Sequence, residues 1–183
     1  MVASVQSRSA WSLSAAICAG VLSLPAPAAA LVVLGSRDVP RAVSFGGACV
    51  GCNLSGRELA GARFLGADFS GSTLVGANLR RVRFTGANFS HSDLSRSDLT
   101  EVEITGVDFD DARLKDVRLD GAKIRGASFN GADFEGASLR GVVLYGVDFS
   151  GARNLRQDQL DGACAVGSVR LPRGLAIRTC PSN

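Results

Sequence analysis

A large apolar residue recurs at every fifth position from Leu54 to Phe149, twenty times without an exception. A small residue, most often Ala, lies two positions before all of them except Leu59, and Gly commonly follows two positions after. A helical face repeats about every 3.6 residues and a strand face every 2, so a period of five fits neither element when it is continued. The chain must therefore turn within each unit. The small and the large residue can both point inward, because they are two apart in a short extended segment.

Residues stacked in successive coils should resemble each other, and the large residues sort into four columns when every fourth unit is compared. One column contains only Phe and another contains only Leu. The Phe column is Phe69, Phe89, Phe109, Phe129 and Phe149. The pattern predicts a coil of twenty residues with four sides, and about five such coils. We call the side that carries this column the Phe side.

The repeated unit resembles that of the pentapeptide-repeat family, which runs Ala, Asp or Asn, Leu or Phe, any residue, Gly. Residues 67–71 (Ala-Asp-Phe-Ser-Gly), 87–89 (Ala-Asn-Phe) and 132–136 (Ala-Asp-Phe-Glu-Gly) match it. The resemblance covers about 100 of the 183 residues. It implies an all-β fold, a right-handed quadrilateral β-helix, which we place at residues 47–153.

Residues 1–30 are predicted to be an export signal. One Arg at position 8 precedes an uncharged apolar run from Ala10 to Leu24, and small residues follow up to Ala30. Cleavage near Ala28 or Ala30 would leave no stable membrane span; an uncleaved anchor is the alternative. Residues 31–46 would then form an N-terminal lead and cap. Chains with such signals reach the bacterial periplasm, the cell exterior or the thylakoid lumen.

The five-residue period ends at Asn154, where a large residue is due. The segment from Leu155 to Ala165 has a helix-compatible composition, and Leu155, Leu160 and Ala163 could share one face. We expect residues 154–183 to form a cap with a short helix over the last coil, since an open solenoid end exposes its core. This tail also resembles caps in exported members of the family. Caps in the family can mediate dimers, which implies a homodimer through this end.

Export would leave four cysteines, Cys49, Cys52, Cys164 and Cys180, an even number that suits an oxidising compartment. The sequence permits three pairings. We favour Cys49 with Cys52 and Cys164 with Cys180, because each pair is local to one end of the solenoid. The CxxC spacing also permits a thiol-redox function. A zinc site would need two pairs separated by more than a hundred residues, so no metal is expected.

Charge differs between neighbouring sides of the predicted coils. The Phe side carries five acidic residues and no Lys or Arg: Asp68, Asp108, Asp110, Asp111 and Asp148. The side that precedes it in each coil carries four basic residues against Glu103: Arg63, Arg83, Lys123 and Arg125. Residues 47–153 as a whole contain 13 basic and 14 acidic residues. The acidic side is the candidate interaction surface.

These charges exclude several classes of function. Mimicry of DNA, which protects gyrase in the family, needs dense negative charge, so we regard it as an unfavoured alternative. Direct nucleic-acid binding is not expected, because an acidic side and scattered aromatic residues do not suit it. His91 and Asp111 are one coil apart and are interpreted as a surface ion pair. We assign no catalytic, cofactor-binding or metal-binding residue.

We therefore predict a non-enzymatic exported scaffold, which presents adjacent acidic and basic sides to an unknown protein partner. A thiol-redox protein that uses Cys49 and Cys52 is the alternative from another class. A stable spacer without a specific partner is a third hypothesis.

Overall fold

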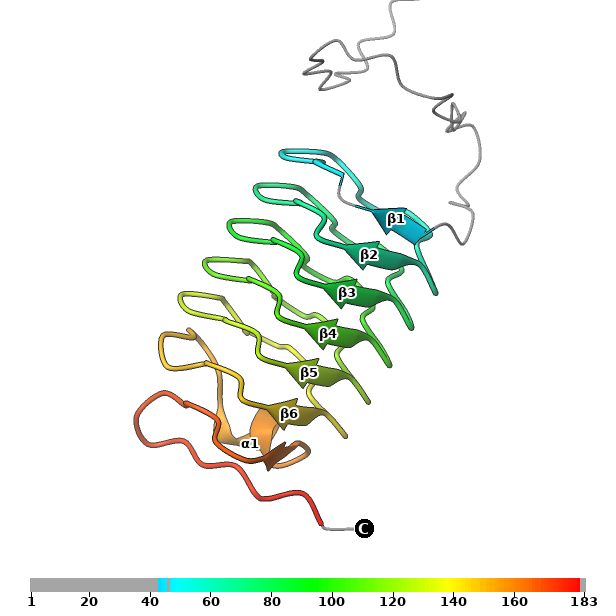
Figure 1. The fold of residues 1–183 in the computed structure, drawn as a ribbon. Helices are drawn as coiled ribbons and strands as arrows, with labels where there is room; N and C mark the ends of the chain where they lie inside the picture. Colours follow the sequence, from blue (N-terminus) through cyan, green and yellow to red (C-terminus); the bar gives the residue numbers. More distant parts are fainter. Residues whose placement is uncertain (1–42, 46, 182–183) are drawn as a thin grey trace, which may run out of the picture. The chain divides into compact units, whose positions relative to one another are not determined.

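The computed structural model describes residues 43–45 and 47–181. Seven strands of three residues each form one parallel sheet in chain order, and the chain turns through one coil between consecutive strands (Figure 1). The strands are β1 (Val43–Phe45), β2 (Arg63–Leu65), β3 (Arg83–Thr85), β4 (Glu103–Thr105), β5 (Lys123–Arg125), β6 (Val143–Tyr145) and β7 (Cys164–Val166). The export signal and residues 31–42 of the N-terminal lead lie outside the described residues.

The coil contains twenty residues, as the columns predicted. Partners on neighbouring strands from β1 to β6 are twenty positions apart, for example Phe64 and Phe84. The other three sides are joined by single parallel bridges at the same spacing, for example between Asp68 and Asn88. The fold is the right-handed quadrilateral β-helix that the sequence predicted. The side that precedes the Phe side contains β2 to β6, and we call it the strand side.

The core is a narrow column of inward side chains. Neighbouring rings of the Phe column are stacked, with centroids 4.8–5.2 Å apart and planes within 15° of parallel. Phe109 in the middle of the stack is 1% exposed. Each stacked pair adds about 0.5–1.5 kcal/mol to the free energy gained by burial of the rings. The stability of the solenoid therefore comes mainly from this continuous core, because strands of three residues contribute few hydrogen bonds each.

The corners of the coils require a left-handed backbone conformation, which Gly adopts without steric cost. Six corner positions carry other residues with φ between 54° and 58°. They lie in two consecutive coils and are Arg81, His91, Arg96, Glu101, Asp111 and Asp116. The corner between the strand side and the Phe side, by contrast, is Gly in every coil from Gly66 to Gly146.

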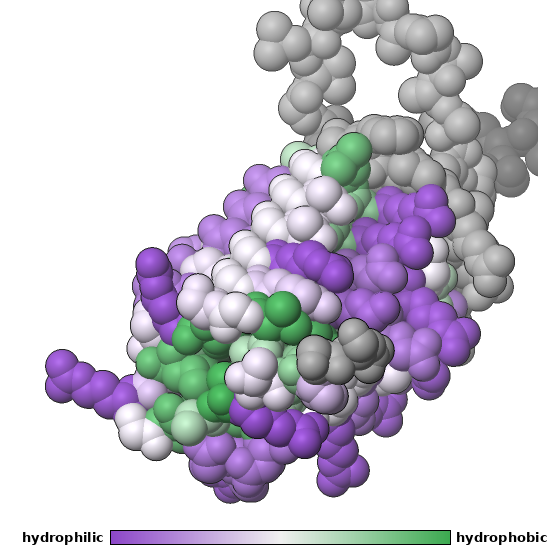
Figure 2. Space-filling view, turned by 60° about the horizontal axis from the view of Figure 1, so that its bottom comes forward, coloured by the Kyte–Doolittle hydropathy of each residue, from purple (hydrophilic) through white to green (hydrophobic). Residues whose placement is uncertain are grey.

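The C-terminal cap contains the single described helix, α1 (Gln157–Leu160). The cap has the short helix that was expected: within the helix-compatible segment from Leu155 to Ala165, α1 has one turn, and β7 occupies the end of the segment. Leu155, Leu160 and Ala163 are nevertheless all buried. Figure 2 looks toward this end and shows hydrophobic surface among hydrophilic residues. Among the described residues, no helix has the length and apolarity needed to cross a membrane.

Candidate interaction surface

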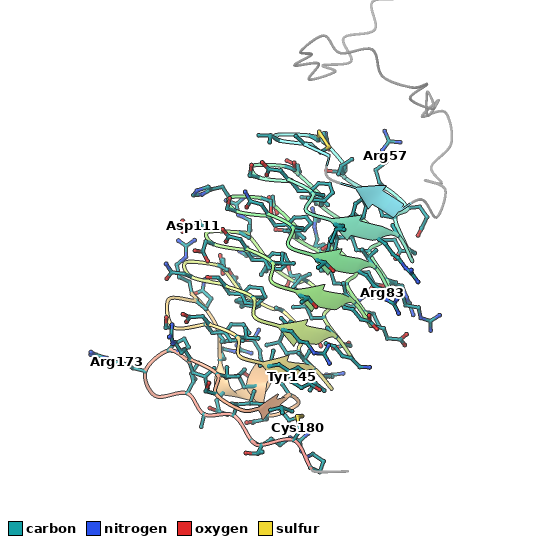
Figure 3. The ribbon with its side chains drawn as sticks, viewed as in Figure 1. Arg57, Arg83, Asp111, Tyr145, Arg173 and Cys180 are labelled. Carbon is teal, nitrogen blue, oxygen red and sulfur yellow. A yellow bond between two sulfur atoms is a disulfide. The ribbon has the colours of Figure 1, made fainter. Side chains whose placement is uncertain are left out.

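The two residues that flank each inward large residue point outward, so each side of the solenoid presents two columns of side chains. Arg63 and Leu65 flank Phe64 in this way on the strand side, and both are exposed. The chemistry of the described coils is therefore set by these flanking positions and by the corners. Arg83 and Asp111 extend outward at opposite edges of the coils (Figure 3).

Three aspartates of the Phe side have a structural role that the sequence analysis missed. The Oδ1 atom of Asp68 accepts a hydrogen bond from the backbone N–H of Ser70 at 3.0 Å. Asp108 and Asp148 accept the same bond from the residue two positions later, at 2.8 and 2.9 Å. Asn53, Asn78 and Asn88 make it too. These side chains stabilise the turn after each side, a typical role of Asp and Asn.

The negative charge of the Phe side is smaller than its five carboxylates suggest. Asp148 pairs with Arg170 of the cap at 2.9 Å. The pKa of Asp148 is lowered by the backbone N–H of Ser150, with a further contribution from Arg170. Asp110 accepts bonds from the Ser128 hydroxyl and from the N–H of Asn130. Asp148 thus contributes little net charge, whereas no Lys or Arg within residues 47–181 forms an ion pair with Asp68 or Asp108.

His91 and Asp111 meet as the sequence predicted, across two coils. The Nδ1 atom of His91 lies 3.9 Å from a carboxylate oxygen of Asp111, and both side chains are more than half exposed. Both line a shallow groove with a volume of about 230 Å³, together with Asp93 and Arg113. An exposed pair of this kind contributes little to stability.

The strand side retains its positive charge. Arg83 pairs with Glu103 at 2.8 Å. Within the described part of the chain, no carboxylate oxygen lies within 4.0 Å of the cationic nitrogens of Arg63, Lys123 or Arg125. The guanidinium carbon of Arg125 is 4.3 Å from the centre of the Tyr145 ring, a cation–π contact. No carboxylate among residues 47–181 therefore neutralises these three cations.

Ion pairs between neighbouring coils neutralise much of the charge elsewhere. Arg81 pairs with Glu101, Lys115 with Glu135 and Arg118 with Asp98, each at 2.6 Å. The partners are twenty residues apart, so they belong to the same column. Opposite charges at a spacing of twenty are a readable signal in the sequence when charges are compared by column; a count by side hides them.

The cysteines are paired as favoured: Cys49 with Cys52 and Cys164 with Cys180. The Cys49–Cys52 loop lies in the first coil, where both residues are partly buried. The hydroxyl of the buried Ser72 donates to the carbonyl oxygen of Cys49 and accepts a bond from the N–H of Cys52. The loop is thus fixed to the coil above it. Over residues 43–45 and 47–181, no group of three or more His, Cys, Asp or Glu residues is arranged to hold a metal ion.

Comparison with known proteins agrees with the observed repeat. A profile described as pentapeptide repeat region matches residues 79–149, and one described as pentapeptide repeats (8 copies) matches residues 49–86. A solved pentapeptide repeat protein from the Arabidopsis thaliana thylakoid lumen is 31% identical; the match covers 62% of this chain and 80% of that one, with a TM-score of 0.51. The chain belongs to the pentapeptide-repeat family.

A second solved pentapeptide-repeat structure shares the fold at lower identity. QnrB1, a plasmid-mediated fluoroquinolone resistance protein, is 17% identical, and the match covers 75% of this chain and 92% of that one, with a TM-score of 0.56. This likeness concerns the fold alone. Among curated proteins, none matches the chain. As a pentapeptide-repeat protein, the chain is a scaffold in a family that is not known for enzymes.

Proposed function

We propose that this pentapeptide-repeat protein is a non-enzymatic, exported scaffold that binds a protein partner through the outer sides of its coils. One observation carries the proposal: inward side chains are apolar and buried, whereas two adjacent sides differ in charge along the same rigid column. A rigid surface loses little conformational entropy on binding, which favours association. Binding through this surface needs no interior site.

Export is supported by three independent features. The signal-like pattern of residues 1–30 precedes the repeats, and both disulfides suit an oxidising compartment. The similar Arabidopsis protein is from the thylakoid lumen. We therefore propose the periplasm, the cell exterior or a thylakoid lumen as its location.

The alternatives receive less support. A DNA mimic needs continuous negative charge, but residues 47–153 are close to neutral and Arg170 neutralises Asp148. A redox function through Cys49 and Cys52 requires an accessible sulfur, whereas both residues are only partly exposed and Ser72 of the next coil bonds to the backbone of each.

The test is crosslinking and capture from the native envelope or lumenal fraction, with the mature protein and an acidic-side variant. The variant changes five residues to Asn: Asp68, Asp108, Asp110, Asp111 and Asp148. Asn makes the same turn bond at Asn53, Asn78 and Asn88, so the fold should survive. A partner that wild type captures and the variant loses would support the proposal.

The other two sides offer a matched control with five further Asp-to-Asn changes. Asp93, Asp98 and Asp133 make the same turn bond. Asp120 accepts bonds from the next coil as Asp110 does, and Asp116 is a left-handed corner residue like Asp111. The control set is therefore Asp93, Asp98, Asp116, Asp120 and Asp133. If both variants lose the partner, net charge alone explains capture; if no protein is captured, the spacer hypothesis replaces the proposal.

A further inference from the structure

One column of the strand side combines cationic, aromatic and apolar residues. Strand pairing places the residues that follow each inward residue in a single line along the solenoid axis. From β2 to β7, the line is Leu65, Thr85, Thr105, Arg125, Tyr145 and Val166. It spans five steps of about 4.8 Å, or roughly 24 Å, the length of an extended segment of about seven residues.

Both ends of this line are apolar and exposed. Leu65 is 46% exposed and Val166 is 42% exposed. Among residues 47–181, only one other large hydrophobic residue is comparably exposed, Val50 in the first coil. Tyr145 lies next to Val166 in the line and is held against Arg125. Tyr and Arg are enriched among the residues that dominate binding energy at protein interfaces.

The charge of the strand side indicates the chemistry of the partner that it would bind. Arg63 and Lys123 stand in the parallel column beside this line, and Arg125 stands within it. None of the three has a carboxylate within 4.0 Å among residues 43–45 and 47–181. A partner with carboxylates near these positions would be attracted and oriented by them.

The two edges of the strand side leave room for a bound chain. At the edge shared with the Phe side, a Cβ atom built on Gly66, Gly86, Gly106, Gly126 or Gly146 would meet no atom within 4 Å. At the other edge, a groove of about 400 Å³ is lined by Arg81, Arg83, Glu101, Glu103 and Lys123, and by Gly121. The strand side is therefore bordered on one edge by glycines without side chains and on the other by a polar groove.

We propose that the strand side docks an extended, acidic segment of a protein partner, with carboxylates on Arg63, Lys123 and Arg125 and apolar side chains on Leu65 and on Tyr145 with Val166. This inference rests on the proposed function, that the solenoid is a binding scaffold, and names a second surface and its ligand class. Glu103 interrupts the cations, which disfavours a continuous phosphate backbone. The three cations that lack a carboxylate partner among the described residues also fall short of the clusters of about four to eight that bind anionic lipid surfaces.

The test uses a fluorescein-labelled peptide with Leu at one end, Phe at the other and six Glu between them. Binding is measured by fluorescence anisotropy with the disulfide-bonded protein. Charge reversal at Lys123→Glu with Arg125→Glu should weaken binding by at least about tenfold. The matched control is Arg96→Glu with Arg140→Glu, which changes net charge equally at two exposed residues on other sides. The control should bind within about twofold of wild type.

A second variant separates the apolar contribution from charge. Leu65→Ser removes an exposed apolar side chain and leaves every cation in place, so it should weaken the peptide severalfold at unchanged stability. Equal losses in the reversal and control variants, no binding of the peptide, or tighter binding of single-stranded DNA or phosphatidylserine vesicles would each overturn the inference. If a partner captured from the envelope or lumen depends on the acidic side and ignores Lys123→Glu with Arg125→Glu, the proposed function stands and this inference fails.

Discussion

The coils of residues 47–153 and the cap of residues 154–181 continue the same parallel hydrogen-bond ladder by different means. In the coils, each side is specified by one small and one large inward residue. In the cap the spacing changes: Val143 pairs with Cys164, and Asp148 pairs with Arg170, 21 and 22 positions later. The backbone hydrogen bonds tolerate this change in spacing because every residue except Pro carries a backbone N–H donor, whatever its side chain.

What differs is how each region fills its interior. The coils bury a large residue on every side, whereas the cap depends on a few buried side chains, a disulfide and side-chain bonds to the backbone. The Nε2 atom of Gln159 donates to the carbonyl oxygens of Phe134 and Ala137, and so satisfies the open edge of the last coil. The coils are thus stabilised by the same buried contacts in each unit, whereas the cap is stabilised by individual contacts that occur once.

The largest expected effect is on the coils. Phe109→Ala removes a ring stacked between Phe89 and Phe129, and should lower the free energy of unfolding by about 3–5 kcal/mol. Phe64→Ala, at a partly exposed position of the first complete coil, should cost less. Urea unfolding measures both; an unchanged midpoint for Phe109→Ala would contradict the inward register.

The second prediction concerns the cap. Cys164→Ser with Cys180→Ser opens a loop with a sequence separation of 16, which should cost about 2–3 kcal/mol. Cys49→Ser with Cys52→Ser opens a separation of only 3 and should cost less. Hydrogen exchange should show loss of amide protection first in residues 157–181. Equal destabilisation by the two double variants would argue against loop closure as the cause.

A smaller effect is expected where the cap meets the last coil. Gln159→Ala leaves the carbonyl oxygens of Phe134 and Ala137 without this donor, at a cost of about 1–2 kcal/mol. Gln157→Ala is the control, because Gln157 is exposed and bonds only within the cap. Thermal unfolding compares the two variants. Equal destabilisation by Gln157→Ala and Gln159→Ala would contradict a special role for the bonds between Gln159 and the last coil.

The smallest effect is a dependence on pH within the coils. Burial acts to raise the pKa of Asp98, but hydrogen bonds from Thr100 and Arg118 outweigh it and lower the pKa below its usual value. A lowered carboxyl pKa gives stability that is present above the unfolded value, about 3.9, and is lost as pH falls through the folded value. Asp98→Asn keeps an acceptor for the turn. Its free energy of unfolding should therefore be lower than that of wild type by less than about 1 kcal/mol at pH 7, a difference that we call its deficit.

The pH series provides the check on Asp98. The deficit of Asp98→Asn should shrink as pH falls below about 4, because wild type then loses the same charge. Denaturant unfolding at several pH values from neutral to strongly acidic measures it. A deficit that stays constant down to pH 2 would show that the Arg118 pair contributes nothing to the pH dependence.

The coils were predictable because one short rule, small and large residues two apart, recurs in every unit. The role of Asp68, Asp108 and Asp148 was also present in the sequence, as Asp or Asn directly before the large residue, but only the bonds to the next turn reveal it. The cap was less predictable. After Asn154 no second copy exists for comparison, so the shift that buries Leu155 and the shortness of α1 depend on tertiary contacts.

The five-residue side has a consequence for how this surface can change over time. A duplication of one coil, twenty residues, would lengthen the column and keep every later side facing the same way. A duplication of one unit, five residues, would preserve the inward alternation but carry everything beyond it through a quarter turn around the axis. In this architecture a short local insertion acts as a rotation, so one half of the charge pattern would face a new direction relative to the other, and the core would repack only where the Phe stack is interrupted.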